Sequence, residues 1–134
     1  MLLAVDVGNT STVLGLYRGT RVVAHWRVST DARRMADQYA VLLRGLIELD
    51  GVDPPTRAVV SSVVPHAGRE LASALRRRYD AATVEITHEV VAPLLTIQTE
   101  RPSEVGADRL VNAVAALAYE GDAMIAVDFG TAAN

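Results

Sequence analysis

The stretch Leu2-Leu3-Ala4-Val5-Asp6-Val7-Gly8-Asn9-Thr10 decides the fold. A short apolar run that ends at a glycine-containing turn is typical of a buried strand. A second apolar run, residues 11–17, follows at once, and a third, residues 21–29, comes after the turn Arg18-Gly19-Thr20. Because short connections with glycine join neighbouring strands as hairpins, the chain is predicted to open with three antiparallel strands.

The rest of the chain alternates between helical and extended patterns. Helices are predicted over 35–49, 66–79 and 103–119, and strands over 57–64, 82–87 and 123–129, with a partly exposed extended segment at 90–99. Three strands followed by alternating helices and strands predict an α/β fold, in which helices cover a mixed sheet.

Several residues define these helices. Asp50-Gly51 closes the first helix, and Pro65 ends the strand before the second. Leu71 and Leu75 are predicted to face inward from the second helix. Ser103 is a good N-cap for the third, whose apolar face would carry Val111, Val114 and Leu117.

Composition excludes several classes of protein. The chain has 134 residues, half of them hydrophobic, a net charge of −3 and no cysteine. An acidic chain is a poor candidate for nonspecific nucleic-acid binding, and the basic run Arg76-Arg77-Arg78 is interpreted as a solvated helix end. Without cysteine there are no disulfides and no thiolate chemistry. No apolar run reaches the length of a membrane span, so we expect a cytoplasmic protein without a membrane partner.

The turn after the first strand carries the first candidate site. Asp6 stands near the end of the strand, at the edge of the sheet, where its carboxylate can position a hydrated Mg²⁺. Gly8 permits a tight turn, and the backbone N–H groups of such a turn can meet phosphate oxygens. Asn9, Thr10, Ser11 and Thr12 add short polar side chains. The alternative is an ordinary hairpin turn in which Asp and Asn bond their own backbone.

A second stretch repeats this pattern near the end of the sequence. Ala126-Val127-Asp128-Phe129-Gly130-Thr131 is again an apolar run that ends in Asp, any residue and Gly. The repetition indicates a duplicated domain, with two loops that grip a nucleotide's phosphates from opposite sides of a cleft. The sequence contains no P-loop motif and lacks the other elements of a protein kinase.

The third candidate site is Glu104-Val105-Gly106-Ala107-Asp108-Arg109, at the predicted start of a helix. Gly106 allows a ligand to approach the helix start, where free N–H groups favour anions. Asp108 could accept a hydroxyl proton during phosphoryl transfer, and Arg109 could bind a carboxylate or phosphate. The alternative is an acidic helix start that complements the helix dipole, with Arg109 solvated.

Other polar and aromatic residues are given structural roles. The three histidines, His25, His66 and His88, lack metal-ligand spacing with one another. Trp26 is predicted to lie in the core or an interface. Ser61-Ser62, at the end of a strand, could line the cleft.

With these motifs in place, the chain resembles the type III pantothenate kinases, within the superfamily of acetate and sugar kinases, heat-shock protein 70 and actin. The resemblance rests on residues 6–10, 102–109 and 128–132, in their order and separation. It implies an actin-like (ribonuclease H-like) fold and ATP-dependent phosphorylation of pantothenate, the first step of coenzyme A biosynthesis. It also implies a homodimer whose substrate site lies near the subunit interface.

The resemblance also implies residue roles. Asp108 would be the catalytic proton acceptor, within a pantothenate-binding segment of Gly106, Ala107, Asp108 and Arg109, with a further substrate contact at Thr99. Asp6 would lie near the Mg²⁺ of the nucleotide, in contact with it directly or through water, and Asp128 would bind a monovalent cation, K⁺ or NH₄⁺. ATP contacts would come from Asp6, Val7, Gly8, Asn9, Thr10, Ser11, Thr12, Val13 and Thr131.

The sequence departs from the family pattern at four positions. Thr99 and Arg101 stand where many members have Tyr and Asn, and Ala133 and Asn134 stand where the second phosphate loop has two Thr residues. The resemblance covers the whole chain but only about the first half of a typical member. We therefore expect a first actin-like domain over 1–121 and the first strand and phosphate loop of a second over 122–134. The adenine-binding part would lie in the other half.

Two other functions compete with the kinase. A noncatalytic accessory regulator of gene expression is conceivable, although the acidic balance counts against DNA binding. A noncatalytic dimerisation module of the same fold is the other alternative, and it would bind neither ATP nor pantothenate.

Overall fold

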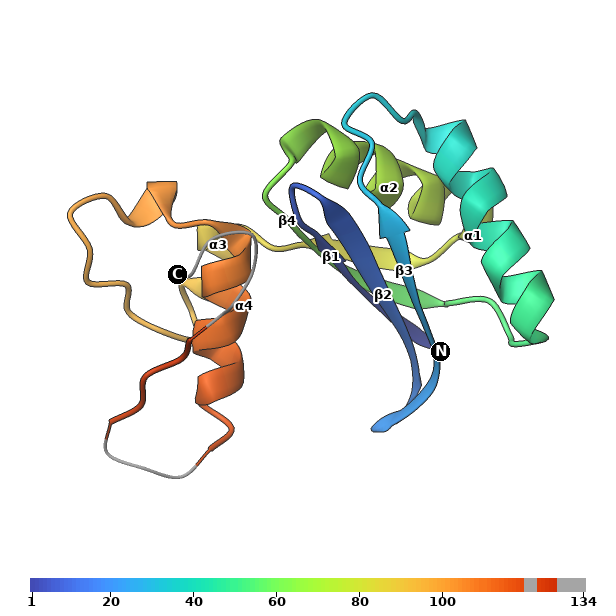
Figure 1. Cartoon of the computed structure of the whole chain (residues 1–134). Helices are drawn as coiled ribbons and strands as arrows, with labels where there is room; N and C mark the ends of the chain where they lie inside the picture. Colours follow the sequence, from blue (N-terminus) through green and yellow to red (C-terminus); the bar gives the residue numbers. More distant parts are fainter. Residues whose placement is uncertain (120–122, 128–134) are drawn as a thin grey trace. The chain divides into compact units, whose positions relative to one another are not determined.

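The computed structural model describes residues 1–119 and 123–127, which form two compact units. The first, Met1–Glu85, contains a five-stranded sheet and two helices (Figure 1). The second begins at Ile86, and its described secondary-structure elements are helices. The elements of the first unit are β1 (Leu2–Val7), β2 (Ser11–Arg18), β3 (Arg21–Ser29), α1 (Ala36–Asp50), β4 (Arg57–Ser62), α2 (Pro65–Tyr79) and β5 (Ala82–Glu85).

The sheet is mixed, in the order β3-β2-β1-β4-β5. β1 runs antiparallel to β2 and parallel to β4, while β2 pairs antiparallel with β3 and β4 parallel with β5. The predicted opening of three antiparallel strands, followed by alternating helices and strands, is therefore confirmed. Two strands end earlier than predicted: β4 ends at Ser62, because the chain turns into α2 at Pro65, and β5 ends at Glu85.

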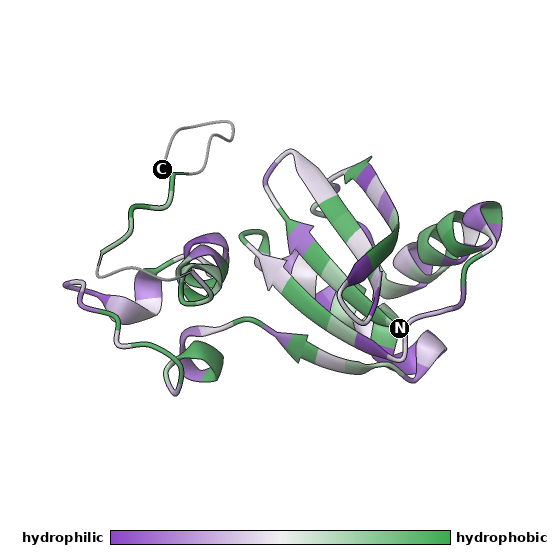
Figure 2. Ribbon diagram, turned by 90° about the horizontal axis from the view of Figure 1, so that it is seen from below, coloured by the Kyte–Doolittle hydropathy of each residue, from purple (hydrophilic) through white to green (hydrophobic). Residues whose placement is uncertain are grey.

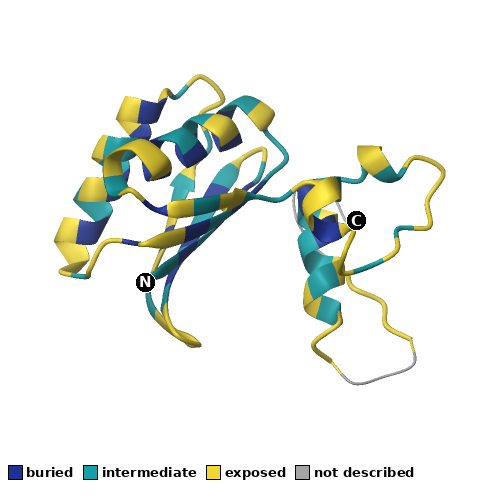
Figure 3. Cartoon of the chain, turned by 180° about the vertical axis from the view of Figure 1, so that it is seen from behind, coloured by how far each residue is buried: buried dark blue, intermediate teal, exposed yellow. Residues whose placement is uncertain are grey.

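One face of the sheet forms the core with α1 and α2. Along β1 the buried residues are Leu3, Val5 and Val7, and burial alternates in the same way along β2 (Figures 2 and 3). Each helix contributes its inward stripe, and the predicted inward residues Leu71 and Leu75 are buried. The residues of this core cluster that the two helices supply are Ala36, Tyr39, Leu43, Ile47, Ala67, Leu71, Ala72, Ala74 and Leu75.

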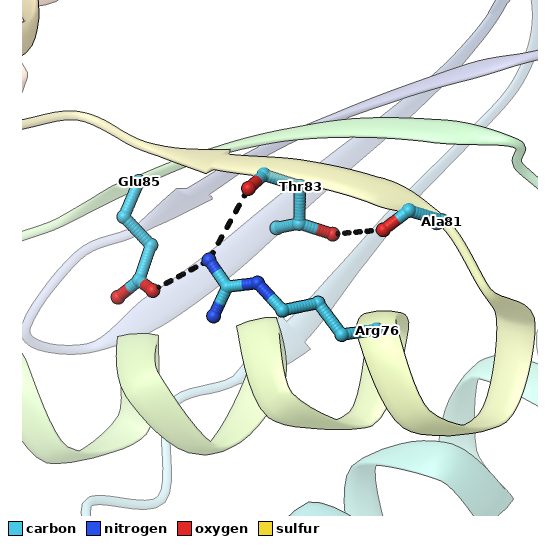
Figure 4. Close-up of polar contacts among 4 residues, drawn as sticks. All are labelled: Arg76, Ala81, Thr83 and Glu85. Atoms are coloured by element: carbon cyan, nitrogen blue, oxygen red, sulfur yellow. Dashed lines mark hydrogen bonds and ion pairs between the residues drawn. The ribbon is translucent and has the colours of Figure 1, made fainter.

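Polar contacts fix the edges of this layer. Trp26 is buried, as predicted, and its indole N–H donates to Asp50 at the end of α1 over 2.8 Å. The predicted basic run at the end of α2 is exposed, yet two of its members form ion pairs. Arg76 bonds the Glu85 carboxylate at 2.9 Å and the Thr83 carbonyl oxygen at 3.2 Å (Figure 4). Arg78 bonds Asp37 at 2.7 Å, and this hydrogen bond lowers the pKa of the Asp37 carboxyl.

The second unit departs from the sequence predictions. The segment expected to be extended opens with a short helix, α3 (His88–Val91), because the Thr87 side chain accepts the N–H of Val90 and caps it. The helix expected from Ser103 begins later. A 3₁₀ turn at Pro102–Glu104 comes first, Val105 is extended, and α4 covers Ala107–Ala116.

The predicted apolar face of this helix is also shifted. Ala107 and Leu110 are its buried residues, whereas Leu117 is 61% exposed. The strand expected at 123–129 is not formed in the described part, residues 123–127. No described strand pairs with these residues, and without such a neighbour an extended segment lacks the hydrogen bonds of a sheet.

Two helical glycines provide a test of the packing. A Cβ added at Gly45, in the middle of α1, meets no atom within 4 Å, whereas one added at Gly68, in α2, would lie 2.6 Å from the Ser62 Cβ. Gly45→Ala should therefore raise the free energy of unfolding by about 0.5–1 kcal/mol, since alanine is the better helix former. Gly68→Ala should lower it by about 1–3 kcal/mol through overpacking.

Urea unfolding of the chain, followed by circular dichroism, measures both changes. Each variant serves as the other's control, because the same methyl group is added to a helix of the same unit. Equal shifts for the two variants would contradict the close approach of α2 to β4.

Candidate functional site

The first candidate site lies where β1 and β4 end side by side. In the parallel register Asp6 is opposite Ser61 and Val7 is opposite Ser62. The Val63 N–H donates to the Val7 carbonyl oxygen at 3.0 Å, so the pairing continues past β4. Pro65 then begins α2, which places the start of a 15-residue helix directly after this edge. Strand ends and a helix start thus meet where the sequence predicted a phosphate site.

Asp6 and Ser61 form the polar pair of this edge. Asp6 is exposed, on the sheet face opposite to Val5 and Val7, while Ser61 is only 5% exposed. The Ser61 hydroxyl donates to Asp6 Oδ1 over 3.3 Å. One carboxylate with neighbouring hydroxyl and backbone oxygens fits Mg²⁺, which keeps several waters and takes few carboxylates. Among residues 1–119 and 123–127, no group of three or more His, Asp or Glu side chains could hold a metal ion by itself.

The turn Gly8–Thr10 is held by its own backbone and by the end of β3. The Gly8 N–H donates to the Ser11 carbonyl oxygen at 3.1 Å, and an added Cβ at Gly8 would meet that same oxygen at 3.1 Å. Thr30, the residue after β3, donates its N–H to the Thr10 carbonyl oxygen at 3.0 Å and its hydroxyl to the Gly8 carbonyl oxygen at 2.8 Å. The turn is thus closed by glycine and bound from the side by Thr30.

The predicted ATP-binding residues differ in how far their side chains are exposed. Asn9 and Thr10 are exposed, Ser11 and Val13 are half-buried, and Val7 and Thr12 are buried. The Thr12 hydroxyl lies 2.9 Å from that of Thr30. Val7 and Thr12 therefore contribute to the loop through their backbone and through packing, not through a side chain open to a ligand. Thr131, the remaining predicted ATP contact, lies outside the described residues, as does Asp128.

Two contacts hold the segment between Thr30 and α1. The Arg34 guanidinium lies 5.3 Å from the centroid of the Tyr39 ring, and burial raises the pKa of the Tyr39 phenol. Glu70, in α2, accepts the N–H of Ala36 at 2.8 Å and so ties the starts of the two helices together. The α1 end of the β3–α1 connection is therefore bonded to α2.

The second candidate site lies in the second unit, at the start of α4. Gly106 is the N-cap, and because glycine has no side chain, no side-chain cap accepts an N–H of this helix start. Asp108 is half-buried, and its Oδ1 accepts the Arg109 N–H at 2.8 Å, while Arg109 is exposed. Thr99 is exposed in the preceding segment, and Arg101 pairs with Glu104 at 3.1 Å.

A hollow of about 420 Å³ in the same unit brings some of these residues together. Asp108, Arg109 and Asn112 line it, with small and apolar residues on its other side. Asn112 was not predicted from the sequence, although its position four residues after Asp108 on a helix is a signal that places it on the same face. A carboxylate, a guanidinium and an amide thus face one space.

No helix in the described ranges, 1–119 and 123–127, is long and apolar enough to cross a membrane.

The fold is similar to a chain of a solved PilM–PilN type IV pilus biogenesis complex, with a TM-score of 0.56 and 18% identity. That match covers 87% of this chain and 45% of the other, and it supports the actin-like fold alone.

The sequence comparisons concern a single family. The family model described as type III pantothenate kinase matches residues 2–134. Curated type III pantothenate kinases from Thermus thermophilus and Streptomyces coelicolor are 47% and 45% identical over 98% of this chain. The chain spans about half the length of these relatives, 52% in both cases. By the extent of these matches, the chain belongs to the type III pantothenate kinase family.

Proposed function

We propose that the complete protein containing this chain transfers the γ-phosphoryl group of ATP to the primary hydroxyl of pantothenate, the opening step of coenzyme A biosynthesis. The observation that carries the proposal is the family match over residues 2–134, which spans both candidate sites. As an enzyme of cofactor synthesis that uses ATP, it is proposed to act in the cytoplasm.

The first unit would hold the nucleotide. The loop Gly8–Thr10, at the joined ends of β1 and β4, is proposed to bind ATP phosphates through the side chains of Asn9 and Thr10 and through backbone N–H groups after Gly8, whose own N–H is bonded to the Ser11 carbonyl oxygen. Asp6, supported by Ser61, would orient a Mg²⁺ that neutralises phosphate charge. Thr131 is proposed as a further ATP contact, and Asp128 as the ligand of K⁺ or NH₄⁺.

The start of α4 would hold the acceptor. Arg109 is proposed to bind the pantothenate carboxylate, and the N–H groups at Gly106 and Ala107 to favour this anion. Thr99 is proposed as a further contact. Asp108 would accept the proton of the attacking hydroxyl, while the loops keep the reacting oxygens in line.

The organisation of the complete protein is part of the proposal. Residues 1–121 would form a first actin-like domain and 122–134 the beginning of a second, which would complete the adenine site. The protein is proposed to act as a homodimer without nucleic-acid or membrane partners. Sedimentation equilibrium of the complete protein tests the dimer, and a monomer at micromolar concentration would contradict it.

The proposed base is tested by Asp108→Asn in the complete protein. This change should lower kcat by about 100-fold or more, because general-base catalysis contributes on the order of 10² to 10⁴. Mg-ATP binding, measured by isothermal titration, should stay close to that of the unsubstituted protein. Glu104→Gln is the matched control, since it removes a carboxylate from the same segment. An Asp108→Asn kcat within twofold of the original would contradict the role.

The nucleotide side is tested by Asp6→Asn. The exposed Asp6 is replaced by an isostere that can still accept the Ser61 hydroxyl, so the free energy of unfolding should change little. The dissociation constant for Mg-ATP should rise about 10- to 100-fold, the range expected for loss of one charged contact.

The matched control is Asp53→Asn. Asp53 pairs with Arg18 at the opposite end of the sheet, so this variant carries the same change of charge away from the loop. Equal Mg-ATP affinities for the two variants would contradict the role of Asp6. A complete protein that binds neither ATP nor pantothenate would instead support the noncatalytic module.

A further inference from the structure

We infer that Thr30 is a positioning residue for the reaction: it fixes which way the backbone of the loop Gly8–Thr10 presents its polar groups to the nucleotide. The inference rests on the proposed function of the loop as a phosphate site. Thr30 follows β3 and lies outside the three motifs that define the family resemblance.

Thr30 directs its polar groups at the loop. Its N–H donates to the Thr10 carbonyl oxygen at 3.0 Å, and its hydroxyl donates to the Gly8 carbonyl oxygen at 2.8 Å. A hydroxyl has one proton, so in the 2.9 Å contact between Thr12 Oγ1 and Thr30 Oγ1 the Thr12 hydroxyl must be the donor. We call this chain of bonds, from Thr12 through Thr30 to Gly8 and Thr10, the Thr30 clamp.

The Thr30 clamp has a defined direction. Thr12 is 1% exposed, so its hydroxyl has no alternative partner in solvent, and it orients the Thr30 hydroxyl toward Gly8. The Thr12 hydroxyl donates its proton to Thr30 Oγ1, and the Thr30 hydroxyl donates its own proton to the Gly8 carbonyl oxygen. In this order both hydroxyls are hydrogen-bonded.

The Thr30 clamp affects the partial charge that the loop presents to a ligand. A phosphate site needs backbone N–H groups toward the ligand, since carbonyl oxygens carry negative partial charge and repel phosphate. The Thr30 clamp draws the carbonyl oxygens of Gly8 and Thr10 toward β3, and the Ser11 carbonyl oxygen accepts the Gly8 N–H. These three acceptors are thereby turned into the protein. Loss of the Thr30 hydroxyl would free the Gly8 carbonyl oxygen to rotate toward the nucleotide, while the backbone bond to the Thr10 carbonyl oxygen would remain.

A second threonine offers a matched control. The Thr83 hydroxyl, at the start of β5, donates to the Ala81 carbonyl oxygen over 2.8 Å and is likewise partly buried (Figure 4). β5 runs parallel to β4 and β1, so its start lies at the end of the sheet opposite to the loop. Thr83→Val therefore removes the same kind of bond without touching the candidate site.

The test compares Thr30→Val, Thr30→Ser and Thr83→Val in the complete protein. Thr30→Val should raise the KM for ATP about tenfold, as expected for loss of a hydroxyl that orients a binding loop, with kcat changed less than threefold. Thr30→Ser keeps both donors and should restore the original KM. Thr83→Val should also lower the melting temperature, yet leave the KM for ATP unchanged.

Two results would overturn the inference. One is a KM for ATP within twofold of the original in Thr30→Val, and the other is a Thr30→Ser variant as impaired as Thr30→Val. Should Thr30→Val fail to fold, Thr12→Val is the second variant, because it removes only the donor that orients Thr30. It should raise the KM for ATP two- to threefold, and an unchanged KM would equally overturn the inference.

Failure of the proposed function would look different. A complete protein that binds Mg-ATP but does not phosphorylate pantothenate would refute the kinase. The Thr30 clamp would then be judged by the Mg-ATP dissociation constants of the same variants, against the same tenfold criterion. A complete protein that does not bind Mg-ATP would overturn both.

Discussion

β1 hydrogen-bonds antiparallel to β2 on one side and parallel to β4 on the other, and the rest of the first unit depends on this double pairing. The antiparallel side requires a turn at Gly8–Thr10, while the parallel side brings the end of β4 to the same edge. A parallel connection also needs a crossover, which α1 supplies. One strand thus places a tight turn, a carboxylate and the start of α2 together.

The sequence was sufficient to predict this unit because its signals are local. Alternating apolar residues identify β1 and β2, Gly51 ends α1 in a left-handed conformation, and Pro65 stands at the first turn of α2. Beyond Glu85 the local signals compete. Thr87 caps a short helix that the apolar pattern did not reveal, and Val105 interrupts the helix that Ser103 was expected to start. Residues 123–127 resemble a strand in composition, but a strand is defined by its neighbour.

The same distinction applies to the candidate site. Asp6, Gly8 and Asn9 belong to one contiguous motif, and Asp108 and Arg109 belong to another. Each group can therefore be recognised from the sequence alone. Thr30 is 18 residues from Thr12 and 22 from Gly8, and only the register between β2 and β3 brings it to the loop. Thr12 is the reverse case, since its side chain is polar and lies in the motif, yet it is buried and bonded to Thr30, and its contact with ATP stays a prediction. A sequence pattern identifies polar groups, but not the direction in which the fold turns them.

The origin of the loop's contacts bears on how a nucleotide would be held. The bonds described for the loop and its strand edge all join residues of the unit Met1–Glu85. They are supplied by Gly8, Ser11, Thr12, Thr30 and Val63. Folding of this unit therefore sets the loop's orientation before a ligand arrives. Preorganised donors need no rearrangement when charge is transferred, which is the condition under which backbone dipoles contribute most to phosphoryl transfer. Thr30 is therefore expected to act on nucleotide affinity more than on the chemical step.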